Sequence, residues 1–116
     1  MEGITPIDIS KVRAHLAAKY KLTEDKIDFL LNGLKGSLQA EMSKAQTAAS
    51  QNDLPSLAHA AHSMKGALLN LGLAEWAELA RSIELGAKAS DTIDFNNLVN
   101  ELINGVAILI DSTADK

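Results

Sequence analysis

Residues 27–45 read IDFLLNGLKGSLQAEMSKA, and this run decides the fold class. Thr23 precedes it as an expected N-cap, Glu24 and Asp25 follow at the positive end of the helix dipole, and the polar cluster at residues 50–53 ends it. The apolar residues recur three, four and seven positions apart, which is the spacing of one helix face. They are Ile27, Leu30, Leu31, Leu34, Leu38, Met42 and Ala45. The pattern predicts a long amphipathic helix.

Four other segments carry helical spacing. We expect a short helix over residues 9–19, capped by Asp8 or Ser10, and longer helices over residues 54–71 and 74–89. A last helix begins near residue 95. The expected buried stripes are Val12, Leu16 and Tyr20 in the first helix, Trp76, Ala80, Ile83 and Ala87 in the fourth, and Phe95, Leu98, Leu102, Val106 and Leu109 in the last.

Turn and cap residues mark the ends of these segments. Asp53 is the expected N-cap of the third helix, and Pro55 falls in its first turn, where proline is tolerated. Gly72 is the expected left-handed stop. Asp91, Thr92 or Asp94 opens the last helix. Asn104-Gly105 is a turn signal, but the apolar stripe keeps its phase on both sides, so we expect that helix to continue.

The short connections favour an all-α fold, an up-down-up-down four-helix bundle with an additional short N-terminal helix. The chain has 116 residues and lacks a Pro/Gly-rich linker, so we expect one domain over residues 1–116. Aromatic residues make up 3 % of the chain, which favours helices over strands.

Composition also excludes several functions. The absence of cysteine rules out disulfides and thiolate metal sites. A net charge of −4 argues against nucleic acid and anionic membranes as partners. No apolar run approaches the roughly 20 residues that span a bilayer, and no signal peptide is evident. We expect a cytoplasmic protein without a metal ion or cofactor.

The third helix contains Ala61-His62-Ser63-Met64-Lys65-Gly66, the candidate functional segment. On a helical wheel His62 lies roughly 130° from the centre of the core stripe, and it should therefore face solvent. Gly66 lies one turn further on the same face, although glycine inside a helix costs about 1 kcal/mol relative to alanine. The core stripe is Leu57, Ala61, Met64, Leu68 and Leu71, and the expected exposed face is Ala58, His62, Gly66 and Leu69, with His59 and Lys65 beside it.

An exposed face of small and apolar residues, with few charges, is typical of a surface that binds a partner. The bare glycine beside the histidine suggests that something large must approach the imidazole. Lys35-Gly36 in the second helix provides an internal comparison, because Asn32 stands where the histidine would be. The Lys-Gly pair alone therefore carries little information, and His62 makes the difference.

These motifs resemble the histidine-containing phosphotransfer (HPt) domain family. The resemblance rests on Ala61-His62, Met64-Lys65-Gly66-Ala67 and Leu71-Gly72, followed by Leu79, Ala80 and Ile83-Glu84. It implies that His62 carries a phosphoryl group on Nε2 and that Glu84 accepts a hydrogen bond from Nδ1. It further implies that Lys65 offsets the phosphoryl charge and that Gly66 leaves room for a partner. Ala58, His59, Gly66 and Leu69 are the candidate docking residues.

The same resemblance implies a role in a two-component phosphorelay. The partners would be response-regulator receiver domains and a hybrid sensor histidine kinase. The chain carries no recognisable ATP-binding motif, so we expect a phosphocarrier and not an autonomous kinase. The alternative function is a non-catalytic helical adaptor or dimerisation bundle that binds a partner through the strip around His62.

Other roles for the same residues remain open at this stage. His59 and His62, with Glu84 as a third ligand, could form a zinc site. Glu84 could equally be a solvated charge or an i, i+3 partner of Arg81. Leu69 could be a half-buried core residue instead of a docking residue. His62 itself could be an ordinary exposed side chain.

Overall fold

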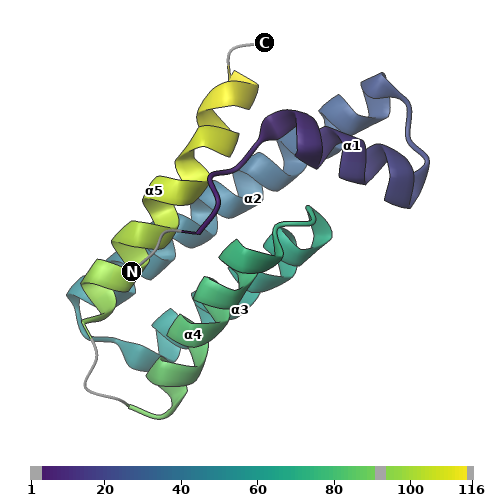
Figure 1. Ribbon diagram of the computed structural model, residues 1–116. Helices are drawn as coiled ribbons and strands as arrows, with labels where there is room; N and C mark the ends of the chain where they lie inside the picture. Colours follow the sequence, from purple (N-terminus) through teal and green to yellow (C-terminus); the bar gives the residue numbers. More distant parts are fainter. Residues whose placement is uncertain (1–3, 91–93, 115–116) are drawn as a thin grey trace.

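The computed structural model describes residues 4–90 and 94–114, and within these residues the chain forms five α-helices and no strand (Figure 1). The four long helices lie side by side, and each packs against two neighbours in the ring order α2, α3, α4, α5. The short α1 packs on α2. The predicted all-α bundle with an additional N-terminal helix is confirmed. The bounds are α1 Ile9–Tyr20, α2 Glu24–Ser50, α3 Leu54–Asn70, α4 Ala74–Lys88 and α5 Phe95–Ala114.

Side-chain caps define the starts of three helices. Asp8 accepts a hydrogen bond from the Ser10 backbone N–H at 3.0 Å at the start of α1. Asp53 does the same for Ser56 at the start of α3, at 3.3 Å. Such caps satisfy N–H groups that have no partner within the helix. Thr23 occupies the N-cap position of α2, but its side chain makes no capping hydrogen bond.

The start of α5 depends on Asp94. Its carboxylate accepts a hydrogen bond from the Asn97 backbone N–H at 3.1 Å. The other two expected openings, Asp91 and Thr92, lie outside the described residues.

The core lies between the four long helices. Every residue of the stripe predicted on α3 is at most 1 % exposed. Burial of each large apolar side chain contributes roughly 1.5–3 kcal/mol, so this stripe holds α3 in a fixed rotation about its axis. Tyr20 was expected in the stripe of α1 but is exposed, because it is the last residue of α1 and lies beyond the buried Leu16.

Gly105 has a packing role in α5, which continues through Asn104-Gly105 as predicted. A Cβ atom on Gly105 would lie 2.0 Å from the indole ring of Trp76 on α4, so only glycine fits there without a shift. Trp76 is buried, and its Nε1–H donates to the Thr5 carbonyl at 3.1 Å. The indole thus connects α4, α5 and the segment before α1.

The turn between α3 and α4 determines the geometry of the site. Gly72 has φ +78°, the left-handed conformation expected of a helix stop. The Leu73 N–H donates to the Leu68 carbonyl at 2.9 Å, which closes the end of α3. The chain then reverses, so that α4 runs back along α3 (Figure 1). No helix among the described residues is long and apolar enough to cross a membrane.

Candidate functional site

His62 lies on the outer face of α3, one turn before Gly66. Its side chain is 63 % exposed, as the helical wheel predicts. Apart from its chain neighbours and the adjacent backbone of α3, a Cβ atom on Gly66 would meet no described atom within 4 Å. The space beside the imidazole is therefore open, and the glycine is not required by packing within the described chain.

The carboxylate of Glu84, which lies on α4, contacts the imidazole of His62. Its Oε2 atom lies 2.9 Å from His62 Nδ1, although the two residues are 22 positions apart in the chain. The Glu84 side chain is only 4 % exposed. The antiparallel pairing of α3 and α4 after the turn at Gly72 brings the two residues together. Glu84 is therefore not the solvated surface charge that the sequence left open.

Two lysines hold the buried carboxylate. Lys65 Nζ lies 3.0 Å from Glu84 Oε1, and Lys88 Nζ lies 3.0 Å from Oε2. Arg81 is not a partner of Glu84, since it pairs with Glu78 at 2.9 Å. A buried carboxylate is costly unless it is paired, and here two cations and an imidazole surround it.

These contacts fix the protonation state of Glu84. Burial alone would raise the pKa of the carboxyl group, but the contacts with Lys88, Lys65 and His62 outweigh it and lower the pKa to about 2. Glu84 is thus ionised at neutral pH and can only accept hydrogen bonds.

The state of Glu84 in turn selects the tautomer of the neutral His62 ring. Because the carboxylate at Nδ1 is an acceptor, the proton of the neutral ring lies on Nδ1. The lone pair is then on Nε2, to which no hydrogen bond is made by the described residues. The ring is consequently oriented with a nucleophilic nitrogen away from Glu84.

Two of the expected docking residues, Leu69 and Ala58, differ in their exposure to solvent. Leu69 is 51 % exposed and is a surface residue outside the core. Ala58 was expected on the exposed face but is only 6 % exposed, and that expectation is wrong. Ala58 lies with Glu84 and Lys88 in the wall of one hollow, which means that α4 covers its small methyl group.

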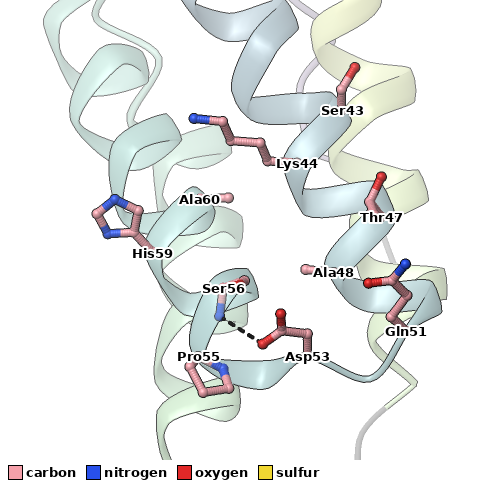
Figure 2. Close-up of a pocket in the computed structure, with 10 residues that line it drawn as sticks. All are labelled: Ser43, Lys44, Thr47, Ala48, Gln51, Asp53, Pro55, Ser56, His59 and Ala60. Atoms are coloured by element: carbon pink, nitrogen blue, oxygen red, sulfur yellow. Dashed lines mark hydrogen bonds between the residues drawn. The ribbon is translucent and has the colours of Figure 1, made fainter.

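His59 is exposed and borders two surface hollows. One hollow of about 440 Å³ lies beside His62 and is lined from α3 and α4. The other, of about 590 Å³, lies between α2 and α3, with Lys44 on the α2 side (Figure 2). Figure 2 also shows the Asp53 cap at the lower end of this groove.

Sequence reasoning missed Lys88. The signal was present, because Glu84 and Lys88 are four positions apart in a predicted helix, with the acidic residue first. That spacing is common on solvated helix faces, so it does not reveal a functional site by itself. The burial of Glu84, which the spacing does not predict, distinguishes this pair from an ordinary surface pair.

A metal site finds no support in the geometry. No group of three or more His, Asp or Glu side chains in the described part of the chain is arranged to hold a metal ion. The Glu84 carboxylate, which a zinc ion would need, is already held by two ammonium groups. Their charge would oppose a bound cation.

Comparison with known proteins identifies the family. The family model described as Hpt domain matches residues 30–109, which is well over half of the chain. Comparison with curated proteins and with solved structures gave no match. The matched segment includes α3 and α4 in full, and with them His62, Lys65, Gly66 and Glu84. The chain therefore belongs to the Hpt domain family, the phosphotransfer modules of two-component signalling.

Proposed function

We propose that the chain relays a phosphoryl group between the aspartates of two receiver domains, with His62 as the phosphoacceptor. The observation that carries this proposal is the contact of the buried, ionised Glu84 with His62 Nδ1, which leaves Nε2 free on an exposed ring. A nucleophilic histidine needs this combination of a fixed tautomer and an accessible second nitrogen.

The transfer step requires no base. The Nε2 lone pair attacks the phosphorus of an aspartyl phosphate, and the P–O bond to the aspartate breaks with its electron pair leaving on the carboxylate. The His62 ring becomes a phosphoimidazolium that keeps its proton on Nδ1, where Glu84 stabilises the positive charge. The reverse attack by the aspartate of a second receiver returns the ring to its starting state.

Lys65 and Gly66 have complementary roles in this proposal. The Lys65 side chain is 25 % exposed and its ammonium group pairs with Glu84, so it adds positive charge to the carboxylate cluster that contacts the His62 ring. Gly66 leaves room for the active-site loops of a receiver. His59 and Leu69 extend the docking surface along α3, whereas Ala58 contributes only the floor of the hollow beside His62.

The proposed partners are receiver domains and a hybrid sensor histidine kinase, with the chain acting in the cytoplasm as a carrier and not as an autonomous kinase. No nucleic acid, membrane, metal ion or cofactor takes part. The lines of support are the family and the exposed His62 with Glu84 at its Nδ1 atom, in a chain whose sequence has no recognisable ATP-binding motif.

The test is transfer from a receiver domain that has first been phosphorylated with acetyl phosphate. A panel of receivers from the same cells is incubated with the chain, and phosphate on the chain is tested for lability in acid and stability in base. We expect His62→Gln to abolish this phosphate while keeping the helical circular dichroism of the parent, since the side chain lies outside the core.

His59→Gln is the matched control, because it removes an exposed histidine from the same helix one turn earlier. Because His59 belongs to the proposed docking surface, His59→Gln should slow the transfer, but it should not abolish the phosphate. Phosphate that persists on the His62 variant and disappears from the His59 variant would overturn the assignment. Receiver binding without any phosphate on the chain would favour the adaptor function instead.

A further inference from the structure

The cluster around Glu84 carries an excess of positive charge. One carboxylate is paired with two ammonium groups, so the cluster has a net charge of +1 when the His62 ring is neutral. The chain as a whole carries −4. A surplus cation next to an exposed histidine, in an acidic protein, needs a reason beyond neutralising Glu84.

The two lysines are not equivalent. Lys65 pairs with Oε1 and is largely buried, with 25 % of its side chain exposed. Lys88 is 61 % exposed and pairs with Oε2, the same oxygen that His62 Nδ1 contacts. Lys88 Nζ and His62 Nδ1 therefore lie no more than about 6 Å apart, because each is within hydrogen-bonding distance of one atom.

Lys88 also lines the hollow beside His62, whereas Lys65 does not. The walls of this hollow include His62, His59 and Lys88, and its one acidic residue is the buried Glu84. A doubly charged anion attached to His62 and turned toward this hollow would meet Lys88.

We propose that Lys88 is a second cation of the phosphoryl site, which stabilises phosphohistidine on His62 and slows its loss. This inference rests on the proposed function. Lys88 attracts the phosphoryl dianion, and its charge disfavours the positive phosphoimidazolium from which the phosphoryl group leaves most readily. Lys88 Nζ and the Nδ1–H group of His62 contact the same oxygen of Glu84, Oε2. Lys88 therefore also weakens the hydrogen bond between that oxygen and the ring proton.

The reaction that Lys88 opposes is hydrolysis. Water attacks the phosphorus, the Nε2–P bond breaks, and its electron pair returns to Nε2. The ring becomes neutral with its proton still on Nδ1, and the oxygen and both protons of the water leave as dihydrogen phosphate. Loss of the Lys88 charge should shorten the half-life of the phosphohistidine about threefold to fivefold, the size expected of a partly exposed charge pair.

The experiment needs no protein partner. The chain is phosphorylated with phosphoramidate, the donor is removed by desalting, and the decay of the phosphohistidine is followed by ³¹P NMR. The variants are Lys88→Gln, Lys88→Arg and the control Lys44→Gln. Lys44 is a similarly exposed lysine, 65 % exposed, that pairs with Glu41 on α2. We expect a shorter half-life for Lys88→Gln alone.

Each other result has a distinct meaning. Equal half-lives for the parent and Lys88→Gln would overturn the inference about Lys88 and leave the proposed function standing. An equal loss for Lys44→Gln would also overturn it, because net charge would then be the cause. A parent chain that takes up no phosphate on His62 would overturn the proposed function and this inference together.

A second measurement separates a direct effect from one that acts through Glu84. The ¹⁵N shifts of the unphosphorylated His62 ring report its tautomer. We expect the Nδ1–H form in both the parent and Lys88→Gln, since Lys65 still holds the carboxylate. A change to Nε2–H in the variant would refute direct stabilisation of the phosphoryl group, because Lys88 would then act only by positioning Glu84.

Discussion

We expect the free energy of unfolding to fall when the pH is lowered into the acid range, because the Glu84 carboxylate is then protonated. The folded pKa of Glu84 is about 2, against a usual value of 4.5. The folded state thus binds fewer protons than the unfolded state between these values, and the free energy of unfolding falls as the pH is lowered. The stabilisation is fully present above pH 4.5 and is lost as the pH falls through about 2.

The magnitude follows from the size of the shift. One pKa unit corresponds to 1.36 kcal/mol, so the full shift would contribute about 3 kcal/mol. Two of the three partners, His62 and Lys88, are more than half exposed, and solvent screens their charges. We therefore expect about 1–2 kcal/mol from Glu84, a large part of the stability of a domain of this size.

The assay is urea unfolding followed by circular dichroism, at several pH values from 6 to 2. Glu84→Gln is the comparison, because it keeps the shape of the side chain and removes the titrating group. The parent should be the more stable protein at pH 6, and the two stabilities should converge toward pH 2. A stability difference that stays constant over this range would refute the reasoning, since Glu84 would then stabilise the fold by packing and not by charge.

Further predictions concern the glycines and the ring. Gly66→Gln should raise the free energy of unfolding by up to about 1 kcal/mol, because a helical glycine is replaced in open space, and should slow phosphotransfer from a receiver. Gly36→Gln, also in open space but on α2, should be stabilised equally and transfer phosphate normally, so slow transfer in both would contradict a docking role for Gly66. Gly105→Ala should lose about 1–3 kcal/mol in urea unfolding, because its new methyl group meets the indole; an unchanged midpoint would mean that the ring moves freely. Glu84→Ala should allow the Nε2–H tautomer of His62 in ¹⁵N NMR and slow phosphorylation without abolishing it; an unchanged tautomer would show that the carboxylate does not orient the ring.

Much of the fold follows from local patterns. The stripes on α2 and α3 depend on residue spacing within one helix, and the start of α3 at Asp53 and its stop at Gly72 depend on the chemistry of single residues. These features need no knowledge of the rest of the chain. Tyr20 was expected to be buried but is exposed. A periodic pattern shows which face of a helix is apolar, but it does not show where along the helix the packing against its neighbour ends.

Less of the candidate site than of the fold could be predicted from the sequence. The exposure of His62 follows from a wheel of α3 alone, and that prediction is confirmed. The burial of Ala58 and the gathering of Lys65 and Lys88 on Glu84 depend on how closely α4 packs on α3. That distance is set by side chains on two helices at once. The contact of Glu84 with His62 was expected only from the family resemblance.

The tight turn at Gly72 has a consequence for how the molecule assembles. The described groups around the Glu84 carboxylate all come from one helical hairpin and are at most 22 positions from it in the chain, so their contacts cost less chain entropy than the contacts of α2 with α5. We expect the hairpin to organise early in folding, before α5 closes the ring. Fraying of α1 or of the far end of α5 can then occur in the native state without opening the hairpin, and amide hydrogen exchange should be slower in α3 and α4 than at those outer segments.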